Sequence, residues 1–206
     1  MHASMLDKAA VTALERLGTR LWGFPPNLMK PMVSQLGPVR ALWWFARNMP
    51  RYQRTLRVLG PLRTHLLCVT ISLLNGCAYC SHGHTYAFEL VFLREHGKLF
   101  QRCPESLETL CGLPPAEIRM HMLEAAQQAG LHDDVRWVDR AMRLTLSPGQ
   151  RPTETDDLRV AHLVRMFGVL NRVTIADKTP PDEAHDPINK DEDLKRHYQE
   201  LQAETP

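Results

Sequence analysis

Apolar residues in this sequence recur at the spacing of an α-helix, and no stretch of six residues alternates apolar and polar side chains, as a half-buried β-strand would. Glycine and proline pairs divide the chain into helical segments. With 44% hydrophobic and 23% charged residues over 206 positions, the chain is globular in composition and long enough to bury a core without disulfides. We predict an all-α domain over residues 1–176, with helices at 4–22, 27–36, 39–49, 51–59, 62–74, 77–96, 115–129, 133–146 and 155–175.

The chain changes character after residue 176. Residues 177–206 contain nine acidic and four basic residues, and Pro180, Pro181 and Pro187 interrupt regular structure. Few apolar side chains are available there for burial, which is typical of a segment outside a core. The sequence predicts an extended, polar C-terminal extension, with a short surface or partner-docking helix at 191–202.

Basic residues before this extension are spread over several predicted helices, at Arg40, Arg47, Arg51, Arg54, Arg57 and Arg63. Aromatic residues do not alternate with them, so the pattern favours a solvated basic face over a polyanion site, and no nucleic-acid partner is predicted. No apolar run approaches the roughly 18 residues of a membrane span, and the first helix lacks the apolar core of a signal peptide. We expect a cytoplasmic protein without membrane contact.

The segment Asn75-Gly76-Cys77-Ala78-Tyr79-Cys80-Ser81-His82-Gly83-His84 carries the most distinctive chemistry. If Asn75-Gly76 precede a helix, Cys77 and Cys80 lie in its first turn, where free N–H groups and the helix dipole favour a thiolate. His84 follows Cys80 by one turn on the same face, so a neutral imidazole there can accept the thiol proton, directly or through water. Cys77 is nearer the helix start and is expected to be more exposed to a reducing partner.

Two other interpretations of this segment remain open. Cys77, Cys80, His82 and His84 could bind a metal ion, although structural sites usually take their ligands from two separate segments. Alternatively, the cysteines could be packed core residues beside an ordinary surface histidine. The total of five cysteines excludes a fully paired disulfide framework, and a close pair is typical of redox or metal chemistry. The spacing favours a dithiol redox site.

These residues resemble the alkylhydroperoxidase AhpD and carboxymuconolactone decarboxylase-like superfamily. The family signature is an apolar helix, here residues 66–74, followed by a run that this chain matches at Asn75, Gly76, Cys77, Tyr79, Cys80 and His84. The resemblance is specific over about residues 60–95. It is weaker at residues 23–28 and 167–172, and it does not include the last 30 residues.

The resemblance implies an all-α fold whose subunits assemble as trimers, hexamers or dimers. By motif position, Cys80 would attack a hydroperoxide, Cys77 would resolve the product as a disulfide, and His84 would belong to a proton relay. No haem, flavin or metal cofactor is implied. Electrons would come from a dithiol partner, such as a lipoylated or thioredoxin-like protein.

The sequence departs from the family pattern at one relay position. The family relay usually includes a glutamate twelve residues before the first cysteine, where this chain has His65. If the helices on either side of Asn75-Gly76 form an antiparallel hairpin, residue 65 lies opposite about residue 86, within one turn of His84. His65 can then join the relay, but it cannot supply a carboxylate. Alternatively, His65 is a structural residue bonded to a backbone carbonyl.

The remaining candidates are expected to be structural. Cys68 lies on an apolar helix and should be buried, and Cys103 and Cys111 lack a basic neighbour at helical spacing. Trp43-Trp44-Phe45 is expected to pack in the core or between subunits, which predicts a homo-oligomer. The leading functional hypothesis is a thiol-dependent hydroperoxide reductase or disulfide oxidoreductase. The alternatives are a carboxymuconolactone decarboxylase-like enzyme acting on a ring lactone and a non-catalytic oligomeric module.

Overall fold

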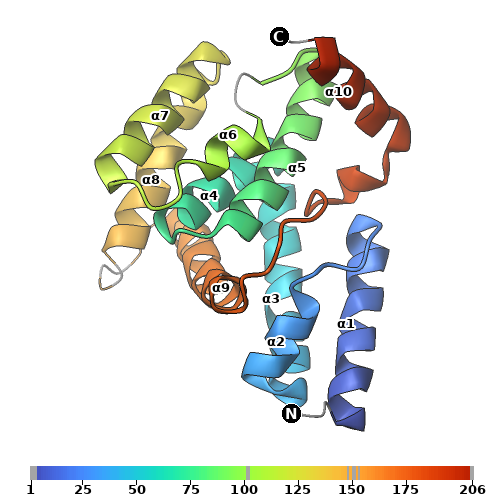
Figure 1. Ribbon diagram of the computed structural model, residues 1–206. Helices are drawn as coiled ribbons and strands as arrows, with labels where there is room; N and C mark the ends of the chain where they lie inside the picture. Colours follow the sequence, from blue (N-terminus) through green and yellow to red (C-terminus); the bar gives the residue numbers. More distant parts are fainter. Residues whose placement is uncertain (1–3, 101–102, 148, 150–151, 153, 205–206) are drawn as a thin grey trace.

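The computed structural model describes residues 4–100, 103–147, 149, 152 and 154–204 (Figure 1). Over these residues the fold is all-α with no strand, which confirms the predicted fold class. None of the helices in the described parts of the chain is long and apolar enough to cross a membrane. The α-helices are α1 (Met5–Trp22), α2 (Met29–Leu36), α3 (Pro38–Leu59), α4 (Pro61–Leu74), α5 (Ala78–His96), α6 (Pro104–Glu108), α7 (Pro115–Gln128), α8 (Val135–Leu146), α9 (Thr155–Asp177) and α10 (Glu192–Glu204), with short 3₁₀ turns η1 (His132–Asp134) and η2 (Pro187–Lys190).

The helical pair α4–α5 forms the centre of the molecule. Figure 1 shows it between α7–α8 on one side and α1–α3 on the other, with α9 below and α10 against the end of α5. Every residue of α4 from Thr64 to Leu73 is buried, which includes Cys68, for which burial was predicted. A helix that is apolar on all sides must be covered on all sides, so the sequence of α4 itself requires the central position.

Helix α3 differs from the prediction of two helices at 39–49 and 51–59. It continues through Pro50 as a single helix. Proline removes one backbone hydrogen bond, to the carbonyl of Ala46, but both residues face the solvent, where water can satisfy that carbonyl. The buried stripe of Phe45, Met49, Tyr52, Leu56 and Leu59 keeps helical spacing across the proline and holds the two halves together.

The sequence predicts that the segment after α9 extends away from the core. This prediction is wrong, because the segment packs against the core. Ala184, His185 and Ile188 are buried, and the Asn189 side chain donates a hydrogen bond to the carbonyl of Trp22 at 3.0 Å. The predicted helix at 191–202 is confirmed as α10, which packs on α5 through Tyr198. A few apolar side chains therefore anchor a segment whose average composition is polar.

Candidate functional site

The turn between α4 and α5 places Cys77 at the N-cap of α5. Gly76 adopts a left-handed conformation with φ of 71°, which favours glycine because it has no Cβ. This turns the chain so that the Cys77 Sγ accepts a hydrogen bond from the Cys80 N–H at 3.4 Å. Both cysteines lie at the start of the central helix, as predicted.

The two sulfur atoms have different electrostatic environments. A hydrogen bond from the Cys80 thiol lowers the pKa of Cys77 to about 7; burial opposes this shift, while the Thr174 hydroxyl at 3.1 Å and the charge of His185 reinforce it. Burial raises the pKa of Cys80, and the adjacent Cys77 raises it further. Cys77 is therefore the thiol of the pair that ionises first, while Cys80 keeps its proton.

The predicted exposure of Cys77 is wrong, because both cysteines are only 1% exposed. Cys77 contacts Thr174 of α9, and Cys80 faces residues of α1, α3 and α9. The N-terminus of α5 is thus enclosed by helices that come from both ends of the chain.

A buried chain of hydrogen bonds leads from α5 to the C-terminal segment. The Nδ1 atoms of His65 and His84 are 3.0 Å apart, and the Nε2 of His65 is 3.0 Å from Oδ2 of Asp186. The hairpin of α4 and α5 therefore brings His65 to His84, as its sequence position indicated. Asp186 supplies the carboxylate that the sequence seemed to lack.

The charge on Asp186 determines the direction of these hydrogen bonds. Burial tends to raise the pKa of Asp186, but the hydrogen bond and charge of His65 outweigh it and lower the pKa, so this group is a carboxylate. A carboxylate only accepts, so the N–H at Nε2 of His65 donates to Asp186. In the tautomer that places both imidazoles in the neutral form, Nδ1 of His65 accepts from the N–H of His84. This assignment leaves the His84 Nε2 as an unprotonated nitrogen. Burial and the charges of His185 and His65 lower the pKa of His84, which keeps its imidazole neutral.

Cys80 and His84 line the same small cavity. Its walls are otherwise mostly apolar, and its volume of about 20 Å³ is enough for one water molecule. The remaining lining residues are Trp22, Leu28, Phe45, Met49, Tyr52, Met166, Leu170 and His185. A small molecule here would meet a thiol and an unprotonated imidazole together.

A second network covers this site from the C-terminal segment. Oδ2 of Asp182 accepts hydrogen bonds from the Tyr79 hydroxyl and the Asn27 N–H, each at 2.8 Å. Its Oδ1 lies 2.8 Å from Nε2 of His185. The His185 ring stacks on Trp22, with ring centroids 5.5 Å apart. Asp182 thus ties three distant parts of the chain together over the first turn of α5.

Gly83 permits this cover to approach α5 closely. The N–H of His185 donates to the Gly83 carbonyl at 3.1 Å, and a Cβ on Gly83 would lie 2.6 Å from two atoms of the His185 ring. Any larger residue at position 83 would therefore collide with the imidazole. The glycine within the cysteine motif is explained by a residue about one hundred positions away.

The other candidates lie outside this arrangement. His82 bonds to Glu108 rather than turning toward the cysteines, and the described residues contain no cluster of three or more His, Cys, Asp or Glu side chains arranged to bind a metal. Cys68 is fully buried, as predicted. Cys103 starts α6, and the Cys111 Sγ lies 3.6 Å from the Ser81 hydroxyl, closer to the cysteine pair than the sequence indicated.

Sequence analysis missed four residues of the site, Thr174, Asp182, His185 and Asp186. The last three lie in a segment whose charges and prolines indicated an exposed tail. The sequence does carry a signal here. Two apolar residues, Ala184 and Ile188, lie on either side of His185 and Asp186, and both are buried in the structure. Comparisons of the chain with family models, with curated proteins and with solved structures found no match.

Proposed function

We propose that this chain is an AhpD-like dithiol peroxidase, which reduces a hydroperoxide with electrons from Cys77 and Cys80. The observation that carries the proposal is the Asp186–His65–His84 chain, which ends at the cavity that Cys80 also lines. Burying three ionisable groups in a row costs desolvation free energy and adds nothing that apolar packing could not supply. General-base catalysis beside a thiol uses a base that a further hydrogen-bonded group orients, and this chain supplies both.

The first step uses Cys80 as the nucleophile. Its sulfur attacks the terminal oxygen of ROOH and the O–O bond breaks, while Nε2 of His84 takes the thiol proton and returns it to the leaving alkoxide as ROH. Cys80 becomes a sulfenic acid, so the sulfur loses the two electrons that the peroxide gains. Asp186 stabilises the positive charge that passes transiently onto the two imidazoles.

The second step uses Cys77, whose lowered pKa of about 7 favours the nucleophilic thiolate. Its sulfur attacks the Cys80 sulfur, the disulfide forms, and hydroxide leaves and takes up a proton to become water. A lipoylated or thioredoxin-like dithiol then supplies two electrons by thiol–disulfide exchange. This cycle needs a reducing compartment, so we propose a cytoplasmic location, which fractionation would test.

Protons can leave the buried site through Asp186. Besides contacting His65, this residue lines an open surface hollow with Arg57, Arg94 and Lys190. The relay therefore connects the cavity at Cys80 with solvent on another side of the molecule. No observation favours the ring-lactone alternative, because lactone chemistry makes no use of a cysteine pair at a helix start.

Peroxide consumption with dithiothreitol or dihydrolipoamide as donor tests the proposal. We expect catalytic loss of hydrogen peroxide, and a non-reducing mass spectrum that loses two hydrogens on mild oxidation and regains them with dithiothreitol. Absence of turnover with both donors, together with no reversible mass change, would leave the non-catalytic module as the better interpretation.

Replacing the carboxylate of the relay should slow turnover without unfolding the protein. Asp186→Asn keeps the size of the side chain and an oxygen that can accept from His65, but it removes the negative charge. We expect about a tenfold fall in kcat/KM at neutral pH, less than the loss of a direct general base. Asp177→Asn, at an exposed acid of the same chain end, is the matched control. Equal activities of the two variants would show that the charge of Asp186 has no part in turnover, and a lower melting temperature of Asp186→Asn alone would assign that charge a structural role.

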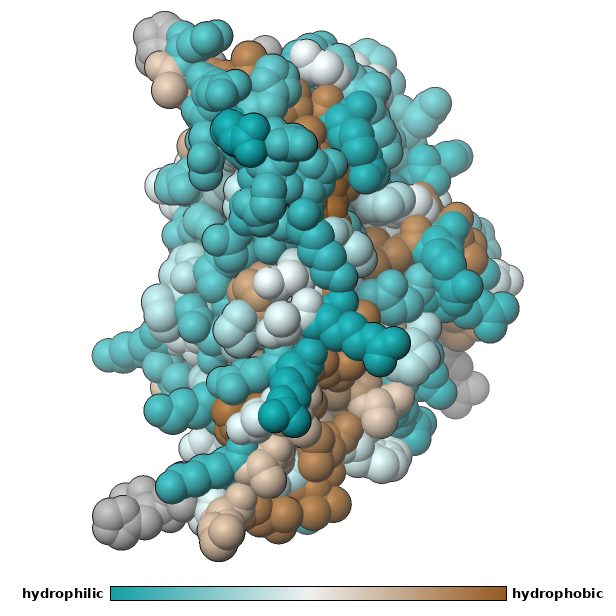
Figure 2. Space-filling view, turned by 90° about the vertical axis from the view of Figure 1, so that its right-hand side faces the viewer, coloured by the Kyte–Doolittle hydropathy of each residue, from teal (hydrophilic) through white to brown (hydrophobic). Residues whose placement is uncertain are grey.

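We also propose that copies of this chain assemble through one apolar end. Figure 2 shows hydrophobic residues gathered at the lower end of the molecule, where Figure 1 places the start of α1 and the α2–α3 connection. Met5, Leu6, Val39 and Trp43 are each at least 56% exposed there. Light scattering at micromolar concentration should give a multiple of 23.6 kDa, and Val39→Asp/Trp43→Asp should give the monomer. A monomeric mass for the unaltered protein would contradict this.

A further inference from the structure

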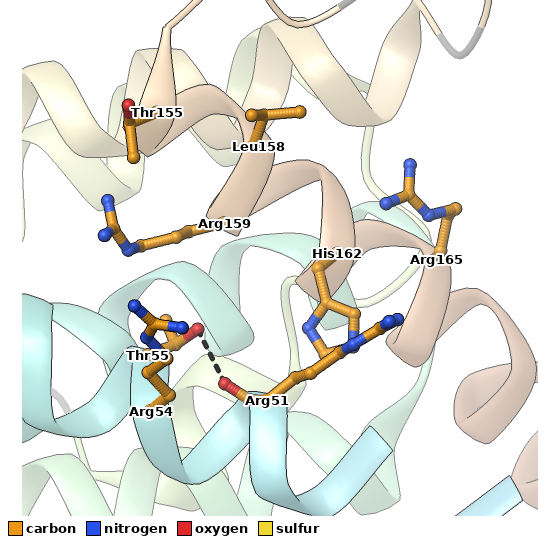
Figure 3. Close-up of a pocket in the computed structure, with 8 residues that line it drawn as sticks. All are labelled: Arg51, Arg54, Thr55, Thr155, Leu158, Arg159, His162 and Arg165. Carbon is orange, nitrogen blue, oxygen red and sulfur yellow. Dashed lines mark hydrogen bonds between the residues drawn. The ribbon is translucent and has the colours of Figure 1, made fainter. Parts of the chain in front are cut away.

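A second hollow lies on the surface between α3 and α9, and it is rich in arginine. Figure 3 shows its walls, with Arg51 and Arg54 on α3 and Arg159 and Arg165 on α9. Its volume of about 400 Å³ is within the range of small-molecule sites. Arg51 and Arg54 seemed part of a scattered basic face in the sequence, but the fold combines them with two arginines from more than one hundred positions away.

Most of this positive charge is not neutralised by the protein. Arg51, Arg54 and Arg165 have no carboxylate partner among the described residues, whereas Arg159 pairs with Asp156 at 2.8 Å. The acidic residues at the start of α9 are engaged elsewhere, because Arg140 bonds to Glu154 at 2.7 Å and to Asp157 at 3.0 Å. Like charges repel, so a fold that gathers three arginines without matching acids, beside a fourth that has one, favours an external anion.

One ring nitrogen of a buried histidine in the wall lacks a hydrogen-bond partner. His162 is 9% exposed, and its Nε2 lies 3.1 Å from Oδ1 of Asn48. The Asn48 amide nitrogen donates to the Trp44 carbonyl, so Oδ1 accepts from His162, and Nδ1 of His162 is left as an unpartnered buried acceptor. Burial and the positive charges of Arg51 and Arg165 lower the pKa of His162 to about 4, which keeps this ring neutral.

We propose that the hollow binds a small molecule carrying phosphate, with its charged oxygens on Arg51 and Arg54 and a hydroxyl directed to His162. Guanidinium groups match the geometry of phosphate oxygens and stay charged at all physiological pH values. A neutral imidazole with a free lone pair accepts from P–OH or from a neighbouring hydroxyl, which a fully deprotonated anion such as sulfate lacks. Leu158, which is 55% exposed, offers an apolar contact for the rest of the ligand.

Calorimetric titration with inorganic pyrophosphate tests the site independently of any peroxidase activity. We expect saturable binding of one equivalent at low ionic strength, weakening as sodium chloride is added because the arginines are exposed to solvent. Arg51→Gln/Arg54→Gln should bind about tenfold more weakly, as expected for the loss of two exposed charge pairs within their usual range of strength.

The matched control is Arg40→Gln/Arg172→Gln, which removes the same charge from exposed positions of α3 and α9 outside the hollow. It should leave the affinity unchanged. Equal weakening in the two double variants would show that net charge alone attracts the anion, and absence of saturable binding to the unaltered protein would exclude the site. Either result overturns the proposal, and neither bears on the cysteine pair.

Discussion

The Cys80→Ser protein should consume no peroxide above background. Cys80 is the cysteine that lines the cavity with His84, so its sulfur is the one that an entering hydroperoxide meets beside an unprotonated imidazole. A serine hydroxyl is a far weaker nucleophile than a thiol, and it cannot form the disulfide that completes the cycle. The loss should be complete with either dithiothreitol or dihydrolipoamide as donor.

Cys77→Ser should separate the two steps of the reaction. One equivalent of peroxide should still oxidise Cys80, but no partner thiol remains to resolve the product, so mass spectrometry should find one added oxygen on Cys80 or further oxidation there. Turnover should stop after that single event. The expected gain in mass distinguishes this variant from Cys80→Ser, in which Cys77 should stay unmodified.

The different pKa values of the two cysteines mean that this experiment can contradict the proposed roles. Cys77, and not Cys80, carries the lowered pKa, so nucleophilicity based on charge alone would assign the attack to Cys77. An oxygen adduct on Cys77 in Cys80→Ser, with none on Cys80 in Cys77→Ser, would reverse the two roles. Cys103→Ser is the matched control, because serine is a good N-cap for α6 and should leave turnover unchanged.

The parts of the site that the sequence predicted are those held by local geometry. The Asn75-Gly76 turn, the position of Cys77 and Cys80 at a helix start, and the meeting of His65 with His84 all follow from one hairpin of adjacent helices. Such contacts span fewer than twenty residues, as the separation of 19 between the two histidines illustrates. Helical spacing and turn residues are sufficient to place them.

The missed parts come from far along the chain. Asp186 is 121 residues from His65, and Asp182 is 155 residues from the Asn27 N–H that it accepts from. No periodicity links such positions, and the charges around them resemble those of a solvated tail. The family pattern has the carboxylate of the relay at residue 65, where this chain has a histidine. In this fold Asp186 supplies a carboxylate that is hydrogen-bonded to that histidine.

Gly83→Ala should destabilise the protein, although alanine is normally the better helix former. The added methyl group would lie 2.6 Å from the His185 ring, which has little room to retreat because it stacks on Trp22 and is held by Asp182. Overpacking of this kind costs about 2 kcal/mol in the free energy of unfolding. The same displacement should uncover the first turn of α5, so iodoacetamide should modify Cys77 and Cys80 faster than in the unaltered protein.

Gly168→Ala is the matched control, because it is the same substitution in helix α9 at a glycine with nothing within 4 Å of the added Cβ. Alanine there should raise the free energy of unfolding by about 0.8 kcal/mol, the usual gain in helix propensity. Urea unfolding should thus move the two variants in opposite directions. If Gly83→Ala were as stable as Gly168→Ala and its cysteines no more reactive, His185 would not be packed on α5. The C-terminal segment would then no longer be the cover of this site, and reduction of the buried disulfide would need another route of access.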